Sequence, residues 1–234
     1  MKKVKKQLKQ QFDEIIFNFK NLLFKNKDIF SGGELVEYGI VSKESKNRLF
    51  DTKNLRSLNN IYYIWDYTED FKKLIFAYKY KRNKAISKLI AELIEEEFRF
   101  ILKNEKIDIV VSVPVNKKRK NDRGYNQVDE ILNQLKVNYV QLERVKNTKK
   151  MSDLLDEKLR EQNIKGAFKV QNNIDFKNKN ILLFDDIITT GATLKEIKNS
   201  ILGMYSKNED RKNIKVTVFC LAAAREIKVN KGEI

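Results

Sequence analysis

The chain has 234 residues, of which 41% are hydrophobic, which suits one α/β domain of ordinary size plus an N-terminal extension. It has no histidine and one cysteine, Cys220, which excludes His-dependent catalysis, an internal disulfide and a cysteine-based zinc site. The formal charge of +16 favours polyanionic partners such as nucleic acid, an anionic membrane surface or phosphorylated ligands, unless it reflects only a lysine-rich, solvated surface.

The first 60 residues predict an N-terminal extension to the main domain, which would cover residues 61–234. Residues 1–25 have apolar side chains at three- and four-residue steps and lysines on the opposite face, which predicts an amphipathic basic helix. Residues 26–60 are polar and contain a Gly-Gly turn, so we expect a small irregular module or hairpin there. No segment reaches the roughly 18 apolar residues of a membrane span, and no signal peptide is evident, so we expect a cytoplasmic protein without stable membrane insertion.

The main domain alternates between helical apolar spacing and short apolar, mostly β-branched runs. In chain order, the pattern predicts helix 68–78, helix 84–103, strand 107–113, helix 126–135, strand 139–142, strand 180–184, helix 192–205 and strand 215–221. The charged segment 144–163 lacks apolar periodicity and predicts a long loop, which is uncommon unless it is functional. Strands that alternate with helices predict an α/β fold with a mostly parallel central sheet flanked by helices.

The strongest local signal is the segment ILLFDDIITTGATL at residues 181–194. Its apolar run ends in Asp185 and Asp186, at the carboxyl edge of the predicted sheet, where open α/β sheets bind ligands. The following turn opens a helix, and unpaired backbone N–H groups at a helix start bind phosphate. Because two adjacent carboxylates can accept hydrogen bonds from vicinal hydroxyls, the pattern fits a ribose 5-phosphate. The phosphate loop would consist of Ile188, Thr189, Thr190, Gly191, Ala192 and Thr193.

Two other interpretations of this segment fit it less well. A nucleotide-hydrolase strand with a Mg²⁺-ordering acid would need a G-x-x-x-x-G-K-[ST] loop, and no glycine here precedes Lys-Ser or Lys-Thr. A plain strand–turn–helix with an acidic cap does not explain two acids and three threonines around one glycine.

The segment resembles the 5-phosphoribosyl-1-pyrophosphate (PRPP) loop of type I phosphoribosyltransferases. Val111–Val115, with the only proline, and the RGYNQ run at Arg123–Gln127 resemble the ComF competence proteins, as do Tyr78-Lys79-Tyr80 and scattered positions between Leu142 and Phe168. The resemblance covers roughly residues 65–224. It implies a type I phosphoribosyltransferase fold and a part in natural competence, where incoming single-stranded DNA is handled, often beside a helicase.

The resemblance also implies roles for single residues. Asp185 and Asp186 would hold the ribose hydroxyls as the catalytic carboxylates, and the threonine loop would hold the 5-phosphate. The pyrophosphate side would consist of Val113, Pro114, Val115, Arg119 and Arg123. The loop 144–163, with Arg144 and Arg160, would be a flexible flap. Mg²⁺ would be held by the ligand's oxygens and water rather than by the protein alone.

Two departures from ComF proteins are visible. Their usual N-terminal four-cysteine zinc ribbon is absent, because residues 1–60 contain no cysteine, and Met151 stands where the family often has glutamine.

The sequence therefore predicts a ComF-like protein that binds PRPP or a related phosphoribosyl ligand. If it is a transferase, a nitrogen nucleophile displaces pyrophosphate from ribose C1, but the acceptor and the general base are open. The alternatives are a non-catalytic adaptor for nucleic acid or a helicase, and a nucleobase salvage phosphoribosyltransferase. Because Asp186 is not expected in the hydrophobic core, the sequence also predicts that Asp186→Asn weakens ligand binding and leaves stability unchanged.

Overall fold

The computed structural model describes residues 27–35, 39–148, 154, 156–171, 173–205, 211 and 213–224. The chain divides into two compact units, residues 1–52 and residues 53–234. The helix predicted over residues 1–25 lies outside the described residues. Among the described helices, none combines the length and the apolar content that crossing a bilayer requires.

The first unit contains helix α2 (Lys43–Asp51) and a turn organised by the carboxylate of Asp28, which is 3% exposed. The Oδ1 atom of Asp28 accepts hydrogen bonds from the backbone N–H groups of Phe30, at 2.7 Å, and Ser31, at 2.9 Å. Its Oδ2 atom accepts from the backbone N–H of Ser42, at 2.5 Å, the residue that caps α2. One carboxylate therefore joins the turn to the start of the helix. No group of three or more potential metal ligands occurs in the part of the chain that the structure describes.

This arrangement predicts that acid weakens the first unit. Burial alone would raise the pKa of Asp28, but hydrogen bonds from Ser42 and Ser31 lower it well below its ordinary value. A carboxyl with a depressed folded pKa contributes stability above its unfolded pKa, about 3.9, and loses it as pH falls toward the folded value. We expect Asp28→Asn to cost about 1–3 kcal/mol near neutral pH, because an amide N–H₂ would face a backbone donor.

Hydrogen exchange resolved by mass spectrometry would measure this effect over residues 27–52. The exposed Asp51, on α2, supplies the control variant Asp51→Asn, which should exchange like the parent protein. Equal protection of residues 28–42 in both variants would contradict the assigned role of Asp28.

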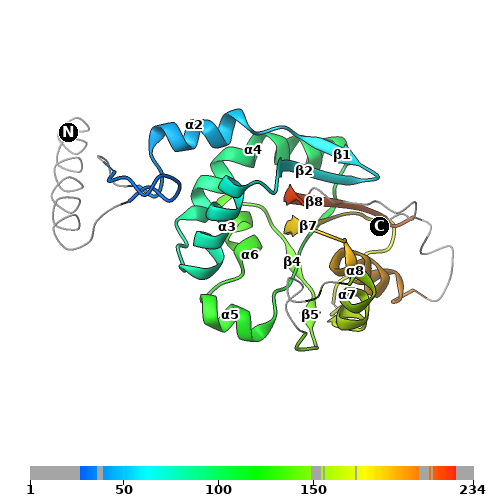
Figure 1. The fold of residues 1–234 in the computed structure, drawn as a ribbon. Helices are drawn as coiled ribbons and strands as arrows, with labels where there is room; N and C mark the ends of the chain where they lie inside the picture. The colour runs from blue at the N-terminus through cyan, green and yellow to red at the C-terminus, as the bar shows by residue number, and fades with distance from the viewer. Residues whose placement is uncertain are drawn as a thin grey trace, which may run out of the picture. The chain divides into compact units, whose positions relative to one another are not determined.

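The second unit is built on a six-stranded sheet in the order β1-β2-β8-β7-β3-β4 (Figure 1). All neighbouring strands are parallel except β1 and β2, which are antiparallel. The strands are β1 (Arg56–Leu58), β2 (Ile61–Asp66), β3 (Ile109–Ser112), β4 (Val140–Gln141), β7 (Asn180–Ile188) and β8 (Lys215–Ala223). A separate two-stranded ribbon joins β5 (Glu143–Arg144) to β6 (Phe168–Lys169). The predicted mostly parallel α/β sheet is therefore confirmed.

Helices cover both faces of this sheet (Figure 1). They are α3 (Glu69–Tyr80), α4 (Ile86–Asn104), α5 (Lys117–Arg123), α6 (Gln127–Gln134), α7 (Glu157–Ile164) and α8 (Ala192–Leu202). Helices α7 and α8 pack on one face, where Ile164, Leu194 and Ile197 join a core cluster with Ile181 and Leu183 of β7. On the other face, the ring of Phe98 in α4 packs against Phe184 and Phe219, with ring centroids 5.6 and 5.5 Å away. Since successive strand residues point to opposite faces, the continuous apolar runs of β7 and β8 supply both cores. Cys220 of β8 is buried in the core cluster on the α7–α8 face.

Several parts of the second unit differ from the sequence prediction, which contained neither α5 nor the ribbon of β5 and β6. Strands β1 and β2 were not predicted, and they pair across Asn59 and Asn60, which adopt φ of 49° and 63°. The predicted boundary after residue 60 therefore falls eight residues beyond the observed division, because β1 belongs to the sheet. The predicted loop 144–163 is wrong from residue 157 onward, because Glu157–Ile164 form α7 with Asp156 as its N-cap.

Another difference is the length of β7. The predicted strand ended at residue 184, whereas β7 continues through Asp185 and Asp186 to Ile188. The two carboxylates therefore lie within the strand rather than in the turn after it.

Candidate functional site

The turn from β7 to α8 forms a small pocket at the carboxyl edge of the sheet. Asp185 and the continuous run from Ile187 to Leu194 line it. Gly191 is the N-cap of α8 and has φ of 75°, a left-handed conformation that glycine adopts without a Cβ clash. The first backbone N–H groups of α8 lie at the edge of this pocket. As at any helix start, they have no hydrogen-bond partner within the helix. The structure thus brings together Asp185 and all six residues of the predicted phosphate loop.

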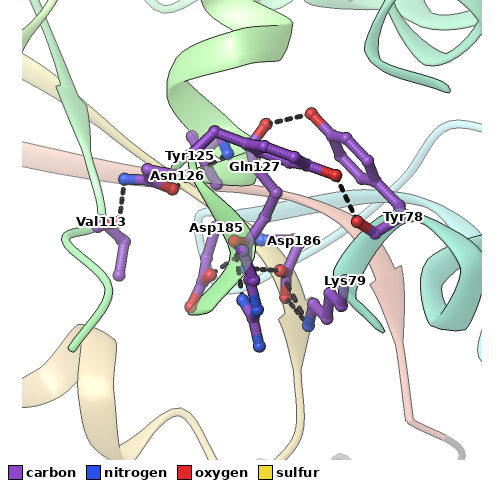
Figure 2. Close-up of polar contacts among 10 residues, drawn as sticks. Tyr78, Lys79, Val113, Tyr125, Asn126, Gln127, Asp185 and Asp186 are labelled. Carbon is purple, nitrogen blue, oxygen red and sulfur yellow. Dashed lines mark hydrogen bonds and ion pairs between the residues drawn. The ribbon is translucent and has the colours of Figure 1, made fainter. Parts of the chain in front are cut away.

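The extension of β7 separates the two predicted catalytic carboxylates. Asp185 pairs with Cys220 of β8 and follows Leu183, and both of these residues belong to the core on the α7–α8 face. Asp186, next along the strand, points to the opposite face and is 5% exposed. Its carboxylate forms an ion pair with Lys79 of α3, whose Nζ lies 2.8 Å from each carboxylate oxygen (Figure 2).

Asp186 also has a hydrogen-bond partner on a second helix. The side-chain amide of Gln127, at the start of α6, donates a hydrogen bond to Asp186 Oδ2 (Figure 2). The amide of Gln127 is oriented by Arg123, whose Nη1 donates to Gln127 Oε1 at 2.8 Å. Asp186 is thus engaged by side chains from two helices.

Two tyrosines hold the helices that supply these partners (Figure 2). The hydroxyl of Tyr78 donates to the backbone carbonyl of Gln127 at 2.8 Å, and the hydroxyl of Tyr125 donates to the backbone carbonyl of Tyr78. Their rings pack with centroids 5.3 Å apart. The end of α3 and the start of α6 are therefore locked together, which fixes the approach of Lys79 and Gln127 to Asp186.

The environment of Asp185 differs from that of Asp186. Its Oδ1 atom accepts a hydrogen bond from the backbone N–H of Asp186, at 2.8 Å. Burial, and secondly the neighbouring negative charge of Asp186, raise the pKa of Asp185 well above its ordinary value. Asp185 is therefore the carboxyl that lines the pocket, and its surroundings favour its protonated form.

The turn after β3 lies beside Asp185, because the backbone N–H of Val113 donates to the carbonyl of Phe184 at 3.0 Å. The side-chain amide of Asn126 donates to the carbonyl of Val113 at 3.2 Å (Figure 2). The carbonyl of the next residue, Pro114, accepts from Nη1 of Arg144 at 3.1 Å. The predicted pyrophosphate turn is therefore fixed from both sides, and Arg144 belongs to the ordered strand β5.

Arg144 and Arg119 form a cationic group at this turn. Both guanidinium groups bond to Thr148, Arg144 to its hydroxyl at 2.5 Å and Arg119 to its carbonyl at 3.3 Å. Burial and the positive charge of Arg119 lower the pKa of Arg144 to about 10, against an opposing contribution from Asp185. The Nε atom of Arg144 is buried and makes no hydrogen bond among the described residues. Two like charges held this close favour an anionic ligand between or beside them.

The remaining predicted arginines are directed elsewhere. Arg123 contacts Gln127 and lies over the ring of Tyr80, with its guanidinium carbon 5.6 Å from the centroid. Arg160 lies in α7, and its Nε donates to the carbonyl of Leu154 at 2.8 Å. Met151 lies outside the described residues.

Lys79 and Gln127 are the site residues that sequence reasoning missed. Both lie in segments that carried the family resemblance, the Tyr78-Lys79-Tyr80 motif and the RGYNQ run. Neither segment shows by its spacing that it meets Asp186, which is 107 residues from Lys79 and 59 from Gln127.

Comparison with protein families gives one match over most of the second unit. A family model named PRTase-CE matches residues 68–231.

Curated relatives point the same way. Competence protein ComFC of Streptococcus pneumoniae is 30% identical over 140 residues, which cover 58% of this chain and 58% of that protein. Competence protein F of Haemophilus influenzae is 32% identical over 145 residues, covering 57% of this chain and 62% of that protein. DNA utilization protein YhgH of Salmonella typhi is 29% identical over 147 residues, covering 58% and 63% respectively. The chain therefore matches somewhat less than two thirds of the length of these relatives.

Among solved structures, the chain is similar to adenine phosphoribosyltransferase from Leishmania tarentolae, with 12% identity and a TM-score of 0.40 over 73% of this chain and 94% of that one. A second is adenine phosphoribosyltransferase from Trypanosoma brucei, in complex with AMP, pyrophosphate and ribose-5-phosphate. It has 13% identity and a TM-score of 0.40 over 76% of this chain and 90% of that one.

Proposed function

The chain belongs to the PRTase-CE family and is a ComF-like protein with the type I phosphoribosyltransferase fold, and we propose that it binds PRPP or ribose 5-phosphate. The observation that carries this proposal is the pocket in which Asp185 and the Thr189–Thr193 loop face the same space at the start of α8. A carboxylate can accept hydrogen bonds from the ribose hydroxyls, and the backbone N–H groups at a helix start can bind the phosphate. The pocket therefore offers a partner to each end of that ligand.

The surroundings of the pocket suit the remaining part of PRPP. The turn beginning at Val113 lies next to Asp185, and Arg119 and Arg144 lie beside this turn. Guanidinium groups grip phosphate oxygens with two parallel hydrogen bonds, so these arginines would hold the pyrophosphate. If the protein is a transferase, their charge would also stabilise pyrophosphate as it leaves ribose C1.

Mg²⁺ fits this pocket only as a companion of the ligand. Asp185 is the one carboxylate that lines the pocket as described, while Asp186 is engaged by Lys79 and Gln127. A Mg²⁺ ion would therefore be bound mainly by the ligand's own oxygens, with Asp185 as the nearest protein carboxylate. When bound, the ion would supply positive charge to the pyrophosphate.

For the biological role, we propose a part in the handling of single-stranded DNA during natural competence, with a competence helicase as a second partner. The names of the relatives, competence proteins and DNA utilization proteins, support this role. A non-catalytic adaptor remains the second candidate, because α5 is basic and has no buried residue. In that case the ligand would be bound without turnover, and its absence would not abolish the partner contacts.

Calorimetric titration with PRPP and with ribose 5-phosphate in millimolar Mg²⁺ tests the proposed ligand. We expect both to bind, and PRPP to bind more tightly because of the pyrophosphate. Incubation of the protein with Mg²⁺, PRPP and a panel of nucleobases, followed by a pyrophosphate assay, separates a transferase from an adaptor. If neither ligand binds the parent protein, the phosphoribosyl proposal is wrong.

Thr193→Val should weaken binding of both ligands by about fivefold, which corresponds to the loss of one neutral hydrogen bond of about 1 kcal/mol. The change removes the hydroxyl of a residue that lines the pocket and retains the backbone N–H groups. Thr68→Val is the matched control, because Thr68 is exposed before α3 and makes no side-chain cap hydrogen bond there. Equal affinities in the two variants would show that the Thr193 hydroxyl makes no contact with the phosphate.

A further inference from the structure

Two aromatic side chains are exposed together near the end of α3. Phe76 is 54% exposed and Tyr80 is 53% exposed, and their ring centroids lie 5.1 Å apart. Residues four positions apart share one face of a helix, so the two rings form a continuous aromatic surface. The next residues along the chain, Lys81 and Arg82, are also exposed. Two large aromatic faces in solvent beside cationic side chains suit a partner that is both flat and anionic.

Helix α5 borders this aromatic surface. Arg123, at its end, places its guanidinium carbon 5.6 Å from the centroid of the Tyr80 ring. The seven residues of α5, KKRKNDR, include five basic residues and one acid, and none of the seven is buried. A run of basic side chains on a surface helix therefore lies adjacent to the aromatic pair.

We propose that Phe76, Tyr80 and helix α5 together form a binding surface for single-stranded nucleic acid. Bases of a single strand stack on aromatic rings with little sequence preference, and each such contact contributes about 1–3 kcal/mol. Lysines and arginines beside the rings neutralise the phosphates between these bases. The guanidinium of Arg123 adds a cationic group over one of the rings. Duplex DNA keeps its bases stacked on one another, so it cannot use the rings.

The aromatic pair points away from the phosphoribosyl pocket, whereas α5 also supplies Arg119 to the proposed pyrophosphate site. Lys79 reaches inward to the buried Asp186, while its neighbour Tyr80 reaches outward into solvent. The last turn of α3 therefore contributes one residue to the interior and one to the surface. The inference rests on the proposed role in handling single-stranded DNA and does not depend on PRPP binding.

Fluorescence anisotropy with a labelled oligothymidine of about 16 nucleotides tests the surface, since single-strand sites span about 4–16 nucleotides. Tyr80→Ala and Phe76→Ala should each weaken binding by about tenfold, the equivalent of one lost stacking contact. Phe100→Ala is the matched control, because Phe100 on α4 is 53% exposed and is not part of the aromatic pair. This variant should bind like the parent protein.

The charges of α5 are tested by salt dependence. Replacing Lys117 and Lys118 with glutamine should reduce the slope of log affinity against log salt by about 1.4, since each phosphate contact to a single strand contributes about 0.7. Lys103→Gln, an exposed residue in the last turn of α4, should leave the slope unchanged.

The outcomes distinguish this surface from the wider proposals. If the parent protein binds the oligonucleotide but the Tyr80 and Phe76 variants bind equally well, the surface is wrong and the DNA role stands. If the parent protein shows no binding at low salt, the surface is wrong and any DNA role must run through a partner, whatever the result with PRPP. Equal affinity for a duplex of the same length would also overturn the stacking surface.

Discussion

Lys79→Met should lower the free energy of unfolding of the second unit by about 3–5 kcal/mol, because it leaves a buried carboxylate without its cation. The side chains of Lys79 and Asp186 are 15% and 6% exposed, and the ammonium lies 2.8 Å from the carboxylate. Gln127 would remain as a partner of Asp186, but a neutral amide does not compensate the charge. Asp186→Asn should be destabilising in the same way, since it leaves the ammonium buried without a counter-charge.

Urea unfolding followed by tryptophan fluorescence measures this effect in the second unit. Trp65 is the only tryptophan, and it is 2% exposed in β2. Lys195→Met is the matched control, because Lys195 pairs with Glu161 at 3.0 Å while the two side chains are 56% and 46% exposed. An exposed pair of this kind contributes at most about 1 kcal/mol.

The double variant Lys79→Met with Asp186→Asn separates an ion pair from a general packing defect. Removing both charges should restore much of the stability that either single change loses. If Lys79→Met costs no more than Lys195→Met, the pair is not buried in solution, and Asp186 would be free to bind a ligand. The ion pair thus reverses the expectation, drawn from the sequence alone, that Asp186→Asn leaves stability unchanged.

The fold was predictable from sequence where the chain uses strong apolar periodicity. Sequence patterns indicated three strands and four helices, because each of them buries a whole face or both faces. These are β3, β7 and β8, from their apolar runs, and α3, α4, α6 and α8, from their apolar stripes. Helix α5 was missed because its seven residues bury nothing, so it has no apolar stripe to detect. Strands β1 and β2 were missed although Asn59 and Asn60, which tolerate positive φ, were a hairpin signal.

The candidate site was predictable in its local part and not in its long-range part. The loop Thr189–Thr193 and its glycine are contiguous, so their chemistry can be interpreted from neighbouring residues. The division between Asp185 and Asp186 depends on where β7 ends, and strand ends are poorly defined by sequence patterns. The ion pair of Asp186 with Lys79 depends on the packing of α3 and α6 against β7, which no local pattern specifies.

Because Asp185 lines the pocket and Asp186 does not, ligand binding should depend on Asp185. Asp185→Asn should weaken binding of PRPP and of ribose 5-phosphate by about ten- to hundredfold, because hydrogen bonds to a charged group contribute about 1.5–3 kcal/mol. The asparagine oxygen can still accept from the backbone N–H of Asp186, so the turn should keep its shape. Stability without ligand should not fall, since the change removes a carboxyl that burial and the charge of Asp186 already disfavour in its ionised form.

The pH dependence of binding provides a second measurement on the same variant. The pKa of Asp185 is raised by burial and by Asp186, so lowering the pH protonates this carboxyl before an ordinary aspartate would be protonated. Affinity of the parent protein should therefore fall between about pH 8 and pH 5, as the acceptor for the ribose hydroxyls loses its charge. The ligand's own phosphate also titrates, with a second pKa of about 6, but this contribution is shared by parent and variant. The difference between the two pH profiles isolates Asp185.

Asp70→Asn, on the exposed face of α3, is the control and should follow the parent profile. If Asp185→Asn binds both ligands like the parent at every pH, the ribose does not contact Asp185, and the pocket holds the phosphate alone or a different ligand.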